Sequence, residues 1–212
     1  MPTAELLAAH GTVHVPDLPG FGKSDDPAHV LTVPQLSDAL AEWMVSNDIP
    51  PAILVGNSLG GQIIAEFASR HGGLLDAAVL VGPTMDPAYP RAITQVYHLA
   101  VDIFREPGRL VALGVLDYLR AGFLRCLRSL GHALAHPVEE VLPLIRVPVL
   151  IVRGGRDPIV SQEWVEKAAL KIPWSRLILI PDAAHAVNFN SPDLLVREIL
   201  DFLSFVENAG KS

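Results

Sequence analysis

Ser58 lies in a stretch whose residue types suit nucleophilic catalysis. It belongs to the run Gly56-Asn57-Ser58-Leu59-Gly60-Gly61, which follows the apolar residues 52–55 and precedes a helix-like stretch, 62–69. The glycines leave room for a sharp turn between a strand and a helix, where bulkier residues would collide with either element. The free N–H groups at the start of the helix also favour an anionic intermediate. We therefore predict that Ser58 is a nucleophile on a strand-to-helix turn.

Two further loops carry the residues that would activate this serine. A histidine must take the proton of the serine, and an acid must orient that histidine. Asp157 comes just after the strand-like run 148–152. His185 comes just after the next strand-like run, 176–180. Because the loops at the carboxyl ends of parallel strands converge on one crevice, we expect Ser58, Asp157 and His185 to meet there.

Other residues compete for the supporting roles. Asp86 lies in the loop after the preceding strand and is the alternative to Asp157 as the acid. Three more histidines, His98, His132 and His136, fall in a helical stretch, where a packed or exposed histidine is the default. We assign them no catalytic role.

The alternation of strand and helix signals predicts an α/β fold, with a mostly parallel open sheet and helices on both faces. Strands are expected near 12–15, 52–55, 77–81, 148–152 and 176–180, with a short helix before Gly11. A longer helix is expected from a capping box at Thr32 and Gln35 to about Asn47. Residues 84–136 show helical periodicity without strands, with breaks predicted at Pro107-Gly108, Gly122 and Gly131.

Four motifs in this order resemble the α/β-hydrolase fold family. They are the serine turn, the run Asp17-Leu18-Pro19-Gly20-Phe21-Gly22-Lys23-Ser24, the Gly-Gly-Arg-Asp turn at Asp157 and the Asp-Ala-Ala-His loop at His185. The chain order Ser, Asp, His is that of the family. The resemblance implies a core formed by residues 1–83 and 137–212, with residues 84–136 inserted as a helical cap over the site.

The resemblance also implies that part of the family pattern is missing. In the family, a strand and a His-Gly loop precede the motif that starts here at Asp17, and that loop supplies a second oxyanion-hole N–H. His10-Gly11 precedes the predicted strand 12–15 and so does not match this loop. We therefore expect an N-terminally shortened fold with a gap in its sheet. The N–H of Leu59 is the one oxyanion donor that the sequence identifies.

Together these features favour a serine hydrolase that acts on a carboxylic ester or a related acyl compound through an acyl enzyme. Two alternatives stay open. The first is a non-catalytic fragment or binding module that retains the triad residues. The second is a hydrolase of carbon–carbon bonds in ring-cleavage products, whose serine turn is similar, although such enzymes usually have Trp where this chain has Ala186.

Several apolar residues of the stretch 84–136 recur at helical spacing. They either line an acyl pocket or pack against other helices, and packing is the more common role of such helical apolar stripes. They are Tyr89, Tyr97, Phe104, Leu113, Tyr118, Phe123 and Leu124. The same stretch has six arginines and four acidic residues. This mildly basic character fits either a carboxylate-bearing substrate or a solvated helix surface.

Composition narrows the classes of partner. The chain has 212 residues, half of them hydrophobic, and a net charge of −7 without a basic run, so we expect neither nucleic acid nor membrane as a partner. With no targeting segment apparent, we expect a cytoplasmic location. Cys126 is the single cysteine and is expected to be a buried thiol. No metal-ligand spacing occurs, and Asp17 replaces the first glycine of a phosphate-binding loop, so no metal or cofactor is expected.

Overall fold

The computed structural model describes residues 2–209, and within that range four parallel strands form one sheet in the order β1-β2-β3-β4. The strands are β1 (Ala52–Asn57), β2 (Leu75–Val81), β3 (Val149–Gly154) and β4 (Ser175–Ile180). Every residue of β3 is buried, because the strand is covered on both faces. The four predicted strands from 52–55 onward are confirmed, with shifts of a few residues at their ends.

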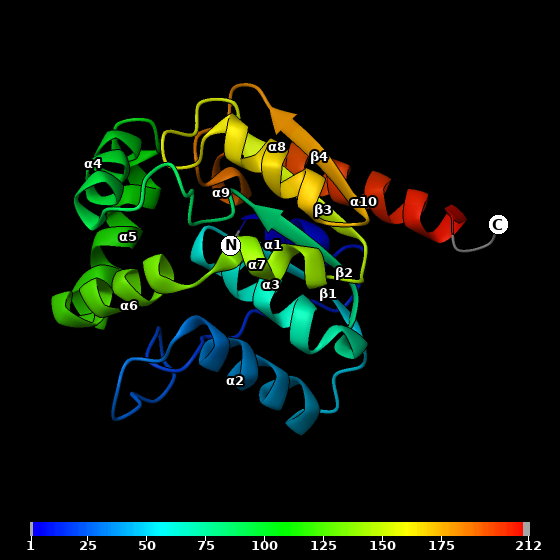
Figure 1. The fold of residues 1–212 in the computed structure, drawn as a ribbon, viewed down its shortest axis with the longest axis horizontal. Helices are drawn as coiled ribbons and strands as arrows, with labels where there is room; N and C mark the ends of the chain where they lie inside the picture. Colours follow the sequence, from blue (N-terminus) through cyan, green and yellow to red (C-terminus); the bar gives the residue numbers. More distant parts are fainter. Residues whose placement is uncertain (1, 210–212) are drawn as a thin grey trace.

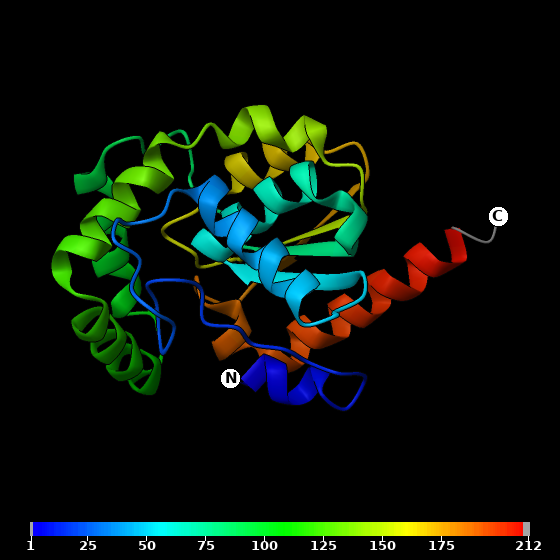
Figure 2. The ribbon, with the colours of Figure 1, turned by 90° about the horizontal axis from the view of Figure 1, so that it is seen from below.

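Helices cover both faces of the sheet (Figures 1 and 2). One face carries α3 (Leu59–Arg70), α8 (Gln162–Lys171) and, outside α3, α2 (Val33–Ser46). The other face carries α10 (Pro192–Ala209), with α1 (Pro2–Leu7) and α9 (Val187–Asn190) beside it. Three short helices also belong to this part of the fold: η1 (Gly72–Leu74), α7 (Val138–Val141) and η2 (Leu142–Leu144). The predicted open α/β sheet is thus confirmed.

The capping box at the start of α2 forms as predicted. The Thr32 N–H donates to Gln35 Oε1 at 2.9 Å, and the Gln35 N–H donates to the Thr32 hydroxyl at 3.4 Å. The predicted short N-terminal helix is α1, and the Thr3 hydroxyl attaches it to α9 by donating to the carbonyl of Asn188 at 2.6 Å. Among residues 2–209, no helix has the length and apolar character needed to cross a membrane.

Three helices between β2 and β3 form a unit that we call the three-helix segment: α4 (Ala92–Ile103), α5 (Gly108–Ala121) and α6 (Phe123–Ala135). They stand together beyond the end of the sheet to which the strand arrows point (Figure 1). The breaks predicted at Pro107-Gly108 and Gly122 are confirmed, and Gly122 has a φ of 82°, which favours glycine. The break predicted at Gly131 is wrong, because a single glycine costs a helix only about 1 kcal/mol.

The strand predicted at residues 12–15 is also wrong. These residues are exposed and have no strand assignment, although their short apolar alternation is typical of a strand. A strand forms only where its N–H and C=O groups pair with those of a neighbouring strand, and residues 12–15 pair with none of the four strands of the described sheet. The expected gap inside the sheet is therefore absent. Instead β1 is an edge strand that pairs with β2 alone, and its Ile53 is 38% exposed.

Candidate active site

Ser58 occupies the predicted turn between β1 and α3. Its backbone has φ 56° and ψ −121°, an unusual conformation for a residue other than glycine. The turn is tight, because a Cβ atom added at Gly56 would lie 2.5 Å from the backbone of Gly60. The Ser58 N–H donates to the carbonyl of Val81 at 2.9 Å, which fixes the turn to the end of β2. The side chain is partly exposed, at the N-terminus of a 12-residue helix that begins with Leu59.

Asp157 and His185 meet, as their positions after β3 and β4 predicted. His185 Nδ1 lies 2.8 Å from Asp157 Oδ2, and both residues are buried. The other carboxylate oxygen of Asp157 accepts the N–H groups of Ile159 at 2.7 Å and Val160 at 3.0 Å. Both oxygens of the acid are therefore held in place. The arrangement fixes the imidazole with Nδ1 toward the acid.

The remaining ring nitrogen of the histidine is free. His185 Nε2 is buried and has no hydrogen-bond partner within residues 2–209. Asn57, the neighbour of Ser58, donates its side-chain amide to the carbonyls of His185 at 3.1 Å and Val81 at 3.2 Å. This amide joins the serine turn to the histidine loop, and nothing in the sequence pattern identified its role.

Gly82 makes room for the acid–histidine pair. Its φ is 49°, and a Cβ atom there would lie 3.0 Å from the His185 ring and 3.2 Å from Asp157 Oδ2. A larger residue at position 82 would therefore displace either the ring or the carboxylate. This requirement was also missed from the sequence, in which Gly82 reads only as the end of a strand.

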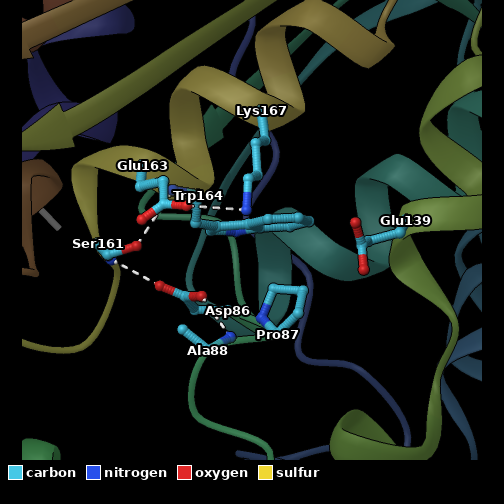
Figure 3. A pocket seen from close by; sticks show the side chains of 8 residues that line it. All are labelled: Asp86, Pro87, Ala88, Glu139, Ser161, Glu163, Trp164 and Lys167. Atoms are coloured by element: carbon cyan, nitrogen blue, oxygen red, sulfur yellow. Dashed lines mark hydrogen bonds and ion pairs between the residues drawn. The ribbon is translucent and has the colours of Figure 1, made fainter.

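Asp86, the alternative acid, does not contact His185. Its carboxylate accepts the Ala88 N–H at 2.8 Å and the Ser161 N–H at 3.0 Å (Figure 3). It lines a separate hollow of about 250 Å³, in which Glu163 and Lys167 form an ion pair at 2.9 Å. Ser58 does not line this hollow. Asp86 therefore joins two loops, and Asp157 is the acid that the fold brings to the histidine.

The C-terminal end of α4 contacts the loop that carries His185. The Asp102 carboxylate accepts the His185 N–H at 3.4 Å. Glu106 accepts the Ala186 N–H at 2.8 Å with one oxygen and the Asn190 side-chain amide at 2.9 Å with the other. Two carboxylates of the chain between β2 and β3 thus hold the backbone on both sides of the histidine.

The same end of α4 also contacts the loop that carries Asp157. His98 bonds through Nδ1 to the carbonyl of Pro158, and Arg105 donates to the carbonyl of Arg156 at 2.6 Å. His98 and Asp102 are four positions apart on α4, which places them on one side of this helix, and Arg105 lies in the turn that follows it. His98 is therefore a contact residue, whereas His136 is packed in the interior, where its Nε2 lies 2.9 Å from Glu66 Oε2.

Negatively charged neighbours favour the protonated form of His185, although burial of the ring opposes it. Burial lowers the pKa of His185, but the hydrogen bond and negative charge of Asp157, with the charges of Asp102 and Glu106, outweigh it and raise this pKa above its ordinary value. Burial raises the pKa of Asp102 to about 6, although the nearby His185 opposes the rise. The site can therefore stabilise an imidazolium ion, as acyl transfer requires.

A hollow of about 220 Å³ opens beside Ser58 between the core and the three-helix segment. Its lining is mainly apolar: Phe21, Leu59, Met85, Val96, Leu99, Leu130, Ala133 and Ile159. The polar side chains in the lining, apart from Ser58, are Thr84, Gln95 and Ser129. Cys126 also lines the hollow and is only half-buried, whereas a buried thiol was expected; its partial burial raises the pKa of this thiol.

Of the seven apolar residues that the sequence offered as lining or packing residues, the six with described side chains do not line this hollow. Phe104, Leu113, Phe123 and Leu124 are exposed, with Phe104 at 91%, so for these four both interpretations are wrong; Tyr97 is also exposed, but the centroid of its ring lies 5.6 Å from that of His98. Tyr89 packs, with its ring centroid 4.3 Å from that of His98. The side chain of Tyr118 lies outside the described residues. The stripes predicted helices but did not show which face of each helix meets the core.

The backbone N–H groups next to the hollow in the loop of Gly20 and Phe21 are engaged within that loop. The Phe21 N–H donates to the carbonyl of Leu18 at 2.9 Å. The neighbouring Gly20 N–H is also engaged, with the carbonyl of Asp25 at 3.0 Å. The assignment of the Leu59 N–H to an oxyanion hole stays a prediction.

The chain is similar in sequence to a known protein family and to several individual proteins. The profile described as "Alpha/beta hydrolase family" matches residues 1–198. A pimeloyl-[acyl-carrier protein] methyl ester esterase of Vibrio cholerae is 23% identical over 226 residues, covering 94% of this chain and 87% of the esterase. The dihydrolipoyllysine-residue acetyltransferase component of the acetoin cleaving system of Pseudomonas putida is 26% identical over 218 residues, and the match covers 93% of this chain but only 57% of that protein.

Among solved structures, an esterase from Exiguobacterium antarcticum superimposes with a TM-score of 0.80 at 20% sequence identity. The match covers 97% of this chain and 85% of the esterase. At this identity the likeness concerns the fold.

Proposed function

Because the chain belongs to the alpha/beta hydrolase family, we propose that it is a serine hydrolase that cleaves a carboxylic ester or a related acyl compound. The observation that carries this proposal is the buried pair of Asp157 and His185, 2.8 Å apart, with the outer ring nitrogen unpartnered among the described residues. The serine turn lies beside this pair, joined to it by Asn57. The name of the Vibrio cholerae relative, a methyl ester esterase, supports an ester as the substrate.

In the proposed reaction, Ser58 Oγ attacks the carbonyl carbon while His185 Nε2 takes the hydroxyl proton. The Leu59 N–H, at the start of α3, stabilises the negative oxygen of the tetrahedral intermediate. His185 then returns the proton to the leaving alcohol, and an acyl enzyme remains. Water, deprotonated by the same nitrogen, releases the acid and restores Ser58. Asp157 holds the ring orientation and stabilises its charged form throughout.

We also propose that the three-helix segment acts as the cap of the site, inserted into a core of residues 1–83 and 137–212. Its helices α4 and α6 supply Val96, Leu99 and Leu130 to the hollow beside Ser58. Because that hollow is small and largely apolar, it suits a compact, uncharged part of an ester. The mildly basic surface of the segment is then a solvated face.

Hydrolysis of 4-nitrophenyl butanoate tests the proposal. We expect the wild type to release 4-nitrophenol and Ser58→Ala to lose on the order of 10⁴-fold or more of kcat/KM, because the variant has no nucleophile. Ser204→Ala, at an exposed position of α10, is the matched control and should retain the wild-type rate. A wild type without activity, or equal rates for wild type and Ser58→Ala, would favour the non-catalytic alternative.

A further inference from the structure

The exposed side chains of residues 92–135 form what we call the outer face of the three-helix segment, which stands beyond the end of the sheet (Figures 1 and 2). This face is largely apolar. Thirteen of the 24 large hydrophobic side chains exposed in the described structure belong to it, although it spans only 44 of the 212 residues. No described side chain of α5 is buried, although more than half of this helix is apolar. So much exposed apolar surface usually marks a site of interaction.

The side chains of α4 show how this face arises. Ile93, Tyr97 and Phe104 lie at i, i+4 and i+11, on one side of the helix and of the residue that ends it, and all three are exposed. The opposite side carries Gln95 and Asp102, which are buried. The helix therefore turns polar side chains inward and apolar side chains outward, which is the reverse of the usual arrangement of a surface helix.

Arginines lie among the apolar residues of the outer face. In α5, Arg109 precedes the exposed Leu113 by four positions, so both lie on one side of the helix. In α6, Arg128 follows the exposed Leu124 by the same spacing. Neither arginine has an ion-pair partner among the described residues, and Asp117 is the one exposed acid within α4, α5 and α6. The net charge of −7, from which we expected no membrane partner, therefore does not describe this face.

This combination of side chains favours an anionic lipid surface as the partner. Apolar side chains enter the boundary between headgroups and acyl chains, and arginines beside them attract the lipid phosphates. A second copy of the chain is a poorer partner, because a two-fold contact through the same face places arginines opposite arginines. The guanidinium groups would then be buried without acidic partners, which is costly.

We propose that the outer face binds the surface of a membrane that contains anionic phospholipids. Phe104, Leu119 and Leu124, which represent the three helices and are 91%, 74% and 67% exposed, enter the headgroup region. Arg109 and Arg128 contact the lipid phosphates. This binding goes beyond the proposed function and does not depend on it.

The outer face also adjoins the hollow beside Ser58. Val96 and Leu99 line the hollow, and the same two residues are 46% and 37% exposed. Binding through the outer face therefore brings the hollow close to the lipid.

Co-sedimentation of the full chain with vesicles tests this inference. The vesicles contain phosphatidylcholine alone, or phosphatidylcholine with an equal amount of phosphatidylglycerol. We expect at least about tenfold higher affinity for the second kind, because each arginine near an anionic surface strengthens binding about fivefold. Salt at about 0.5 M should remove most of this preference.

Two variants separate the charged from the apolar contribution. Arg109→Gln/Arg128→Gln should bind the phosphatidylglycerol vesicles about 5- to 25-fold more weakly, with little change for phosphatidylcholine alone. Phe104→Ser/Leu119→Ser/Leu124→Ser should lose at least about tenfold in affinity for either kind of vesicle. All five side chains are exposed, so both variants should melt close to the Tm of the wild type.

Leu170→Ser and Arg197→Gln are the matched controls. Leu170 is 87% exposed on α8 and the Arg197 side chain is 63% exposed on α10, so both changes affect exposed residues of the same types outside the outer face. Their affinities should equal that of the wild type. Ser58→Ala should also bind like the wild type, since binding needs no turnover. A chain that binds vesicles but hydrolyses no ester therefore counts against the proposed function alone.

Three results of the vesicle assay would overturn the inference: no affinity of the wild type for either kind of vesicle, equal affinity for both, or unchanged affinity in both variants. Light scattering without lipid gives a further test. A dimer of the wild type that dissociates in Phe104→Ser/Leu119→Ser/Leu124→Ser would show that a second copy covers the outer face, and it would also overturn the inference.

Discussion

The two sides of the site differ in how completely their polar groups are paired. Around Asp157 and His185, both carboxylate oxygens have partners and the loop carbonyls are held by Arg153, which donates to Asp157 at 2.9 Å and to Val160 at 2.7 Å. On the side of the hollow, Thr84 and Ser129 have buried hydroxyls without a partner among the described residues. The acid–histidine pair is therefore positioned by hydrogen bonds within the fold, whereas the hydroxyls of Thr84 and Ser129 add no such bond to the walls of the hollow.

The largest effect is expected from Asp157→Asn, which breaks the paired side. Loss of the carboxylate destabilises the imidazolium form and disturbs the ring tautomer, so kcat should fall roughly 10⁴-fold.

The pH dependence of the rate should change as well. Catalysis needs neutral His185, whose pKa is raised in the wild type, so the wild-type rate should rise with pH through a midpoint above the ordinary histidine value. Without the carboxylate, burial should move this midpoint to lower pH. A pH profile of kcat/KM for both proteins measures the shift; an unmoved midpoint would contradict the assignment.

A smaller effect is expected from Glu106→Ala, which tests whether the turn after α4 positions the histidine loop. The change leaves the Ala186 N–H and the Asn190 amide without this acceptor. Each of these groups that stays buried without another partner destabilises the loop by about 1 to 3 kcal/mol. We expect kcat to fall about 10- to 100-fold with KM changed by less than about threefold, because the catalytic groups and not the hollow are disturbed.

Asp117→Ala is the control for this experiment. Asp117 is an exposed acid of α5, paired only with Arg120 at 3.7 Å in the described structure, and its loss should leave both constants within about twofold. Glu106→Gln retains one acceptor oxygen and should give an intermediate kcat. A rise in KM with unchanged kcat in Glu106→Ala would show that Glu106 shapes the hollow instead.

The smallest effect is expected from Asp102→Asn, and it concerns stability. Burial raises the pKa of Asp102 from 3.8 to about 6 in the folded chain. At pH values between these two, the folded state therefore binds more protons than the unfolded state. Stability therefore decreases as pH rises through this window, and asparagine avoids the loss while keeping an oxygen for the His185 N–H. Thermal melting should show equal Tm values near about pH 4 and an increase of a few degrees for the variant at about pH 7.5. A variant less stable than the wild type at the higher pH would contradict this reading.

The sequence predicted the strands of the core and the positions of the three candidate catalytic residues better than the contacts that join them. Apolar runs with turn residues after them placed β1 to β4, and with them Ser58, Asp157 and His185, because the position after a parallel strand fixes the edge at which a residue lies. Residues 12–15 have the same local pattern but pair with no strand, because a local pattern of residue types does not determine which segments pair.

Other contacts left no sequence signal at all. Asn57 and Glu106 bond to groups of the histidine loop that lie 128 and 80 residues away in the chain, and residue spacing does not predict contacts of this kind. The liners of the hollow were also missed. An amphipathic stripe predicts a helix, but the face that meets the core depends on how α4 and α6 are placed, and that is a tertiary property.

The central claim is that Ser58 is activated by the pair of His185 and Asp157, and covalent labelling tests it without a known substrate. The measurement is the intact mass of the purified protein after exposure to an alkyl fluorophosphonate, with Ser58→Ala alongside. We predict one adduct on the wild type and none on the variant. An unlabelled wild type, or an adduct that persists in Ser58→Ala, would contradict the claim.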